Sequence, residues 1–374
     1  MNEVISTDRP VALLGMGQAF PPSLPQDVAA EIAADRCAAD PTQAQWARVI
    51  FKKTGVASRG SVLLRGTSGE ASAGMQEFFR PRSSPEDRGP TTAERMERFA
   101  AHAPDLAEAS SRQALAEARV APAQITHLIT VSCTGFFAPG VDVALIKRLS
   151  LARSVKRLHV GFMGCHAAFN ALGTAADIVR ANPSARVLVC CVELCSLHFA
   201  YGWDPQRLVA NSLFADASAA AIVGPADSAP AGTWLLHDSA SLLLPDCEDA
   251  MTWRIGNHGF EMTLSPQVPD LIRQHVKGWL DGWLSERGMS VASIPNWAIH
   301  PGGPKVLTSV SQSLGLPPDA TDISRRTLSE HGNVSSATIL CILNRLRETA
   351  QPGPCLALGF GPGLMAEAML LTHR

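Results

Sequence analysis

Hydrophobic residues occur along this chain in two kinds of run. Short continuous runs predict strands that are covered on both faces, because such strands need no polar face. In the first half these runs are 11–17, 127–133, 155–160, 186–194 and 217–224. Longer runs, in which apolar residues recur three and four positions apart, predict helices. These helices lie at about 27–39, 42–54, 94–119, 141–149 and 166–181.

The second half repeats this alternation after a small, proline-bearing segment at 225–233. Helices are predicted at about 269–286, 304–314 and 335–349, and strands at 233–244, 259–264, 297–300, 355–360 and 364–372. Strands separated by helices predict a layered α/β fold with a largely parallel sheet. We therefore expect two halves of similar construction, residues 1–229 and 230–374.

The composition narrows the class of protein. Of 374 residues, 46% are hydrophobic and 18% are charged, which allows a sizeable core. The net charge of −2 argues against a general nucleic-acid binder. The nine cysteines are an odd count without framework spacing, and we find neither a signal peptide nor a run long enough to span a membrane. We expect a cytoplasmic protein with reduced thiols.

Cys165, in the stretch GFMGCHAAFNAL, is the first candidate for chemistry. It follows a predicted strand and a turn that ends in Gly164, and a helical pattern begins directly after it. The free N–H groups and the dipole of a helix start favour the thiolate, which is the nucleophilic form of cysteine. The alternative interpretation is a cysteine packed in the core.

Two further residues complete a possible site. His300 ends a predicted strand and opens HPGGP, where glycines allow the backbone to approach a ligand closely. Asn333 lies in HGNVSSA, just before a helical pattern. Taken singly, His300 could be a structural histidine and Asn333 a helix cap. Together with Cys165 they form a set suited to thioester chemistry, in which His300 pairs with the thiol and both donors hold an oxyanion.

Several spaced motifs carry a resemblance that covers nearly the whole chain. They are GVDVALIKRLSL (140–151), SVKR (154–157), GCHAAFNAL (164–172), NSLFADASAAAIVG (211–224), HPGGP (300–304), GNVSSAT (332–338) and GFGPGL (359–364). In these motifs the chain resembles type III polyketide synthases, the chalcone synthase-like branch of the thiolase fold. The resemblance implies a layered αβαβα fold with two pseudo-symmetric halves, the first carrying the nucleophilic cysteine and the second the histidine and the asparagine.

The resemblance also implies roles for individual residues. The family's catalytic triad falls on Cys165, His300 and Asn333, and its gatekeeping phenylalanine falls on Phe214. Cys165 would take an acyl group from CoA, and malonyl-CoA would lose CO₂ while the other two residues hold its carbonyl. The resulting carbanion would extend the acyl chain repeatedly until it cyclises. The resemblance implies acyl-CoA and malonyl-CoA as substrates, no metal or redox cofactor, and a homodimer.

Other positions match substrate contacts of the family. A basic cluster that contacts CoA phosphates falls on Lys52, Lys53, Arg59 and Lys305, all of which could equally be ordinary surface cations. Positions that line the family's cavity fall on Thr134, Cys195, His198, Met262 and Ser335. Cys191, Cys195 and His198 could suggest a metal site, but no fourth ligand is evident, so cavity lining is the better interpretation.

Departures from the plant pattern bear on the substrate. Met262 stands where plant enzymes carry a phenylalanine, and a flexible methionine can admit a long apolar chain. Ala138 stands where a methionine reaches across the plant dimer interface. The segments VSCTGFF and HGFEMTLSP resemble those of bacterial alkylpyrone and alkylresorcinol synthases. This resemblance implies a fatty acyl-CoA starter.

Three other functions fit part of the sequence. A ketoacyl-carrier-protein synthase of the III type shares the fold and the Cys, His and Asn set, but HPGGP, GFGPGL and Phe214 favour the polyketide synthase. A papain-like protease has the same residue order and similar spacing, but its signature is absent around Cys165. A non-enzymatic acyl-binding protein would not need all three triad positions. The starter, the number of extensions and the mode of cyclisation depend on cavity volume, which the sequence does not specify.

Overall fold

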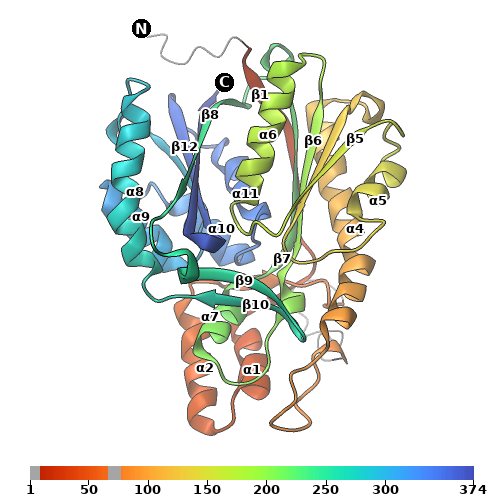
Figure 1. The fold of residues 1–374 in the computed structure, drawn as a ribbon, viewed down its shortest axis with the longest axis vertical. Helices are drawn as coiled ribbons and strands as arrows, with labels where there is room; N and C mark the ends of the chain where they lie inside the picture. Colours follow the sequence, from red (N-terminus) through yellow and green to blue (C-terminus); the bar gives the residue numbers. More distant parts are fainter. Residues whose placement is uncertain (1–8, 66–76) are drawn as a thin grey trace.

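A mixed sheet of nine strands runs through the part of the chain that the computed structural model describes, residues 9–65 and 77–374 (Figure 1). Its order is β11-β12-β13-β8-β1-β7-β6-β4-β5. The strands are β1 (Val11–Ala19), β4 (His127–Ser132), β5 (Lys156–Gly161), β6 (Val187–Leu194), β7 (Asp216–Pro225), β8 (Trp234–Leu243), β11 (Asn296–Ile299), β12 (Pro354–Gly361) and β13 (Met365–His373).

The prediction of a largely parallel sheet was wrong. β4 pairs in parallel with β5 and β6, and β11 with β12, but the pairings of β1, β7, β8 and β13 are antiparallel. The link between β12 and β13 shows the reason. Only the short turn Pro362–Leu364 joins these strands, whereas a parallel pair needs a crossover of a dozen residues or so.

The sheet nevertheless divides into two halves of matching layout. The order β1-β7-β6-β4 corresponds to β8-β13-β12-β11, since each contains two antiparallel steps followed by a parallel one. The halves meet where Val11, Ala12 and Leu13 of β1 pair with β8. The pseudo-symmetric halves expected from the resemblance are therefore confirmed.

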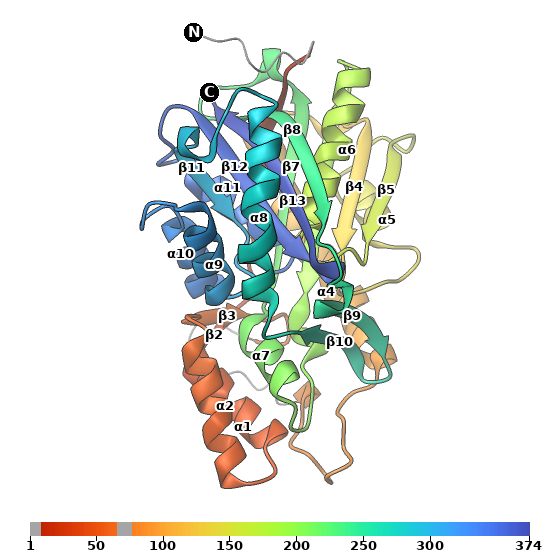
Figure 2. The same cartoon turned by 60° about the vertical axis from the view of Figure 1, so that its left-hand side comes forward.

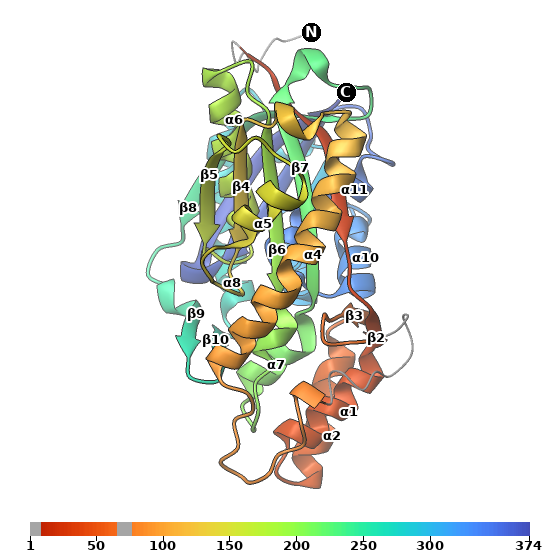
Figure 3. The same ribbon diagram turned by 90° about the vertical axis from the view of Figure 1, so that its right-hand side faces the viewer.

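Helices form three layers around the two half-sheets (Figures 2 and 3). The central helices α6 (Ala167–Ala181) and α11 (Ala337–Leu346) share one core with residues from both halves of the sheet. The outer helices share separate cores with the far faces. They are α4 (Thr92–Ala118) and α5 (Val141–Arg148) on the first half, and α8 (Val268–Ser285) and α9 (Pro304–Leu314) on the second. This is the predicted αβαβα arrangement.

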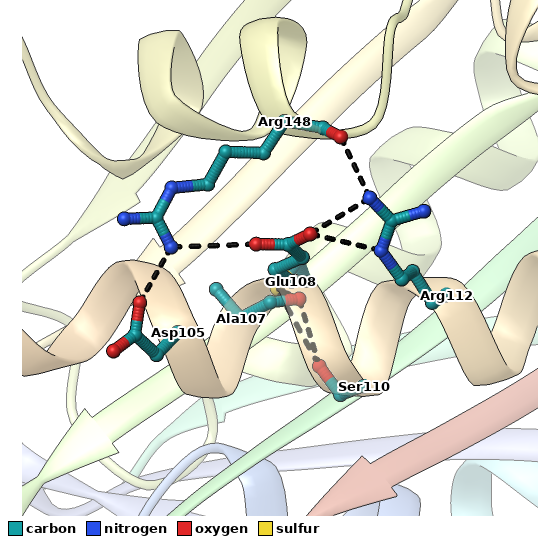
Figure 4. A network of polar contacts seen from close by, with 7 residues as sticks. Asp105, Ala107, Glu108, Ser110, Arg112 and Arg148 are labelled. Atoms are coloured by element: carbon teal, nitrogen blue, oxygen red, sulfur yellow. Dashed lines mark hydrogen bonds and ion pairs between the residues drawn. The ribbon is translucent and has the colours of Figure 1, made fainter.

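A polar network on the surface joins α5 to α4 (Figure 4). Arg148, the last residue of α5, contacts Asp105 and Glu108 of α4 at 2.5 and 3.3 Å. Arg112 donates to the other oxygen of Glu108 at 2.8 Å and to the Arg148 carbonyl at 2.7 Å. These arginine donors satisfy carbonyls and carboxylates at the end of α5 and so fix the outer layer over β4.

A group of smaller elements covers one end of the sheet (Figure 1). They are α1 (Gln26–Cys37), α2 (Pro41–Lys53), α7 (Pro205–Leu213), the β9–β10 hairpin (Met251–Gly256 and Gly259–Leu264) and the β2–β3 pair (Ser23–Pro25 and Ser58–Gly60), while α10 (Asp322–His331) lies beside α9 (Figure 2). Trp253 of β9 donates to the Cys133 carbonyl after β4 at 2.7 Å. Phe260 N of β10 donates to His198 after β6 at 2.9 Å. The hairpin thereby closes over the ends of both strands.

The sequence pattern did not predict α7, α10, β9 or the β2–β3 pair, because each is short and flanked by loops. No helix among residues 9–65 and 77–374 combines the length and the hydropathy needed to cross a bilayer.

Candidate functional site

Cys165 lies in the tight connection between β5 and α6. Gly164 precedes it with φ of 84°, and a Cβ at Gly164 would lie 2.2 Å from Pro362 Cδ. Glycine is therefore required here both by its dihedral and by the close approach of the GFGPGL turn. The helix begins two residues later, at Ala167, so the predicted position of Cys165 at a helix start is correct.

Burial determines the protonation state of Cys165. The residue is buried, and desolvation raises the pKa of its thiol to about 12. The Ser335 hydroxyl, 3.7 Å from Sγ, and the Asn333 amide act in the opposite direction, while buried Glu193 raises the pKa further. The donors around the helix start lower the pKa of the thiol as expected, but desolvation outweighs them, so the resting residue is a thiol.

Asn333 is held by backbone pairing with the segment around Phe214. The two residues form an isolated parallel β-bridge, in which Asn333 N donates to Leu213 O at 2.8 Å and Ala215 N donates to Asn333 O at 3.0 Å. The side-chain oxygen of Asn333 accepts Ser335 N at 2.9 Å. Its Nδ2 is buried and has no partner among the described residues. Ser336, rather than Asn333, is the cap residue of α11, so the amide is available as a donor.

His300 follows β11, and its main-chain N donates to Leu358 O of β12 at 2.8 Å. Both ring nitrogens are buried and neither has a partner among the described residues. Burial, with a smaller contribution from His166, lowers the pKa of His300 to about 3. The resting site therefore holds a neutral imidazole and a neutral thiol, and a proton must move before Cys165 can act as a nucleophile.

A cavity of about 340 Å³ borders Cys165. Its wall includes all six predicted substrate-contact positions, namely Thr134, Cys195, His198, Phe214, Met262 and Ser335. Cys165 and Phe214 are part of the wall, whereas His300 and Asn333 are not. The cavity is mainly apolar near the thiol, where sulfur atoms and aromatic rings form most of it.

The four predicted CoA-contacting cations differ in their burial. Lys52 and Lys53 are exposed at the end of α2, and Lys305 is exposed at the start of α9. Arg59 is buried, stacks 5.6 Å from the centre of the Phe51 ring and donates to the Asn211 carbonyl at 2.5 Å. Burial lowers the pKa of Arg59 to about 10. Arg59 is thus not a surface cation, because its guanidinium is used inside the protein.

Glu193 is a buried site residue that the sequence analysis missed. Its carboxyl accepts the Thr134 hydroxyl at 2.7 Å, the Cys133 main-chain N at 3.1 Å and the Ser336 hydroxyl. Burial raises its pKa above the ordinary range despite these donors. A signal was present in the sequence, since Glu193 is the one charged residue in the otherwise apolar strand VLVCCVEL.

His198 is structural rather than a metal ligand. Its Nε2 donates to the Thr134 carbonyl at 2.7 Å and its Nδ1 accepts Phe260 N at 2.9 Å, so no lone pair remains. Its ring stacks on Phe260 at 4.2 Å and meets Trp253 edge-on. Cys191 is buried in the central core. In the described part of the chain, no group of three or more His, Cys, Asp or Glu residues is placed to hold a metal ion.

His166, the neighbour of Cys165, belongs to a separate chain of hydrogen bonds. Its Nδ1 contacts Asn170 Oδ1 at 3.1 Å, and Asn170 donates to Glu367 at 3.0 Å. A Cβ at Gly361 would lie 2.2 Å from the His166 ring, so that ring is clamped by the GFGPGL turn. These contacts give the ring of His166 a role in the packing around the GFGPGL turn.

Comparison with family models finds two consecutive matches. The model of the N-terminal domain of chalcone and stilbene synthases matches residues 6–227, and the model of their C-terminal domain matches residues 235–373. The matches together cover nearly the whole chain.

Two relatives are similar in sequence. The alpha-pyrone synthesis polyketide synthase-like Pks18 of Mycobacterium tuberculosis is 37% identical over 75% of this chain and 73% of that protein. The 1,3,6,8-tetrahydroxynaphthalene synthase of Streptomyces peucetius subsp. caesius is 36% identical over 71% of this chain and 72% of its own length.

Solved structures are similar over the full length. PKS-I from the brown alga Ectocarpus siliculosus superposes with a TM-score of 0.89 at 29% identity, covering 99% of this chain and 100% of that one. The fungal type III polyketide synthase ORAS superposes with a TM-score of 0.83 at 29% identity, covering 97% of this chain and all of its own.

Proposed function

Because the chain belongs to the chalcone and stilbene synthase family, we propose that Cys165 is its acyl-carrying nucleophile and that His300 and Asn333 hold the thioester carbonyl. The chain is a type III polyketide synthase, an acyltransferase that condenses malonyl-CoA iteratively with an acyl starter. Two observations support the assignment of residues. The Cys165 thiol lies at the cavity wall, and three buried polar atoms, His300 Nδ1 and Nε2 and Asn333 Nδ2, have no hydrogen-bond partner among the described residues.

Acylation begins with a proton transfer. Cys165 passes its proton to His300 as Sγ attacks the thioester carbonyl. The C–S bond to CoA breaks, and the CoA thiolate takes the proton back from His300. The low pKa of His300 opposes the transfer from the thiol and favours return of the proton, so the transfer has to coincide with the attack of Sγ.

Condensation uses His300 and Asn333 as donors to malonyl-CoA. Its thioester oxygen accepts from an N–H of His300 and from Asn333 Nδ2, the bond to the carboxyl group breaks, and CO₂ leaves while the electron pair forms an enolate. The enolate carbon attacks the acyl group on Cys165, and the thiolate leaves. Phe214, beside Asn333, provides an apolar surface that disfavours the carboxylate and favours neutral CO₂.

The CoA moiety is proposed to lie on the Phe214 side of Cys165. Phe214 packs with Val56, three residues after Lys53 at the end of α2. Gly303, which precedes Lys305, packs near Leu213. Lys53 and Lys305 are therefore the exposed cations nearest in sequence to this wall, and Lys52 adjoins them. We assign the CoA phosphates to these three lysines, and no metal or redox cofactor is needed for the reaction.

The starter is proposed to be a fatty acyl-CoA, and the product an alkylpyrone or an alkylresorcinol-type polyketide. Met262, Cys195 and the ring of Phe260 surround the space next to Cys165 with groups that suit an alkyl chain. The name of the mycobacterial relative, which refers to alpha-pyrone synthesis, agrees with this choice.

The test is a panel of acyl-CoAs from short to long chains, each supplied with malonyl-CoA and no carrier protein. Product masses should correspond to several extensions, and turnover should rise with chain length. A preference for acetyl or aromatic starters would overturn the fatty starter, and a single condensation would overturn iterative extension.

The chain is also proposed to act as a cytoplasmic homodimer. β5 is the edge strand of the sheet, and Leu158 on it is 44% exposed, as are Met163 at 41% and Phe136 at 38% in the neighbouring loops. An unpaired strand edge flanked by large apolar side chains suits pairing with a second copy. Sedimentation of the purified protein checks this, and Leu158→Lys should shift the dimer towards monomer.

A further inference from the structure

The cavity continues from Cys165 along one face of α7. Arg207, Ala210, Asn211 and Phe214 all line it, and their spacing places them on a single helical stripe. Phe214 marks the end near Asn333, and Arg207 lies seven residues earlier, about 10 Å along the helix axis. The cavity therefore has a second end, far from the triad.

The wall at this second end is cationic. It includes Arg88, Arg207, Asn257 and His258, while Glu261 is the one carboxylate among the described residues that line the cavity. Glu261 contacts Arg207 at 2.9 Å. Arg88 donates only to the main-chain oxygens of Pro85 and Asp87, and it has no carboxylate partner in the described part of the chain. One guanidinium thus borders the cavity without a counter-charge.

Hydrogen bonds hold these groups in place around the opening. His258, at the tip of the β9–β10 hairpin, contacts the Gly89 carbonyl through Nδ1 at 2.9 Å, which joins the hairpin to the segment that carries Arg88. The Nε2 of His258 has no hydrogen-bond partner among the described residues. Between this end and Cys165 lie the rings of Trp253, His198 and Phe260, which give the middle of the cavity an apolar wall.

We infer that the far end of the cavity binds an anionic group at the distal end of the acyl starter, so that the preferred starter is the CoA half-thioester of a long dicarboxylic acid. This inference rests on the proposed function, since it requires the acyl chain to start at Cys165. A carboxylate accepts two hydrogen bonds from the fork of an arginine, and Arg88 and Arg207 offer two such forks. The aromatic middle section would hold the methylene groups.

The separation of Arg207 and Phe214 along the axis of α7 sets the length of the chain. An extended alkyl chain gains about 1.2 Å per bond, by analogy with an extended backbone that gains about 3.6 Å over three bonds, so a span of about 10 Å requires roughly ten carbons. The phosphates of CoA are the other anions that could reach Arg88. They are assigned to the opposite side, because Val56, three residues after Lys53, packs with Phe214, and Gly303, two residues before Lys305, lies near Leu213.

The experiment compares saturated acyl-CoAs of about eight to twelve carbons with their ω-carboxy counterparts of equal length, since that range brackets the span of the cavity. The wild-type protein should show a kcat/KM about tenfold higher for the ω-carboxy starter, as one charge-assisted pair permits. Arg88→Gln should reduce this ratio to about one, with the KM for malonyl-CoA unchanged. Glu261→Gln should raise the ratio, because it releases Arg207 from its partner.

Arg80→Gln is the matched control, since Arg80 is exposed on the same segment and does not line the cavity. A wild-type preference for the unsubstituted chain would overturn the inference and leave the fatty starter intact. If Arg88→Gln lowers kcat/KM equally for both starters and raises the KM for malonyl-CoA, Arg88 contacts CoA and the inference is overturned. If neither starter yields product, both the proposed fatty acyl-CoA starter and this inference are overturned.

Discussion

Asn333 and Phe214 pair side by side in an isolated parallel bridge, and this pairing joins the amide of the site to the cavity wall. The main chain of Asn333 is fixed on both sides by the Leu213 carbonyl and the Ala215 N–H. Its side-chain oxygen is occupied by Ser335 N, so only Nδ2 can act on a substrate. An asparagine so oriented can stabilise negative charge, but it cannot abstract a proton.

Asn333→Ala should therefore affect decarboxylation more than acylation. Loss of one preorganised donor to an enolate oxygen costs roughly 10²- to 10³-fold in rate. Release of CO₂ from malonyl-CoA should fall by this factor, while the acyl-enzyme, detected by intact mass spectrometry, should still form. Asn182→Ala, at an exposed turn, serves as the control. Equal losses in the two steps would contradict this division of roles.

Alkylation of Cys165 by iodoacetamide should depend steeply on pH. Because burial raises the pKa of the thiol to about 12, the thiolate fraction should rise about tenfold per pH unit over the neutral and mildly alkaline range. The modified cysteine is identified by peptide mass, with Cys165→Ala as the blank. A rate that reaches a plateau below about pH 8 would show a resting thiolate and refute this prediction.

Acid should destabilise the fold partly through His300. Its pKa is about 3 in the folded state, well below the ordinary value, so the unfolded chain binds more protons between pH 3 and the ordinary histidine range. The free energy of unfolding should then rise with pH across this window, and the stability is lost as pH falls through it. Each such histidine contributes at most about 1.4 kcal/mol per pH unit.

His300→Gln should remove the contribution of this histidine to the pH dependence of the free energy of unfolding. Urea unfolding of the variant between about pH 4.5 and 7 should show a shallower pH dependence than the wild type, by up to about 1.4 kcal/mol per unit. His198, whose pKa is also lowered to about 3 by burial, should retain its own contribution in this variant. Identical slopes in the two proteins would rule out a neutral, buried His300.

Gly164→Ala should disrupt both stability and activity. The backbone at Gly164 is in the left-handed region, and the added methyl group would lie 2.2 Å from Pro362 Cδ. The expected cost is about 2 kcal/mol or more in the free energy of unfolding, with displacement of Cys165. Gly278→Ala is the matched control, because a methyl group added there on α8 would meet no neighbouring atom within 4 Å and helix propensity favours alanine by about 1 kcal/mol. If both substitutions cost the same, steric fit at Gly164 does not matter.

Much of the architecture could be predicted from the sequence, because local patterns of apolar residues determine where most strands and helices form. The strands and helices around Cys165 and His300 follow directly from continuous and periodic apolar runs, as at β4, β6 and α6. The three proposed triad positions came from residue type at element ends together with spaced motifs. The α7 helix was missed, since its nine residues form too short a pattern, and yet it forms one wall of the cavity.

The sequence by itself determined the residues proposed to carry the chemistry, the layered αβαβα class and the two matching halves. Tertiary structure alone decided the protonation of Cys165 and His300, because the pKa of each depends on desolvation by elements distant in the chain. It also decided that Arg59 is buried and Arg88 exposed, although both line the cavity, since residue type does not specify burial. Tertiary structure also decided which strands run parallel and which antiparallel, because strand direction depends on the connections in space and not on the pattern within each strand.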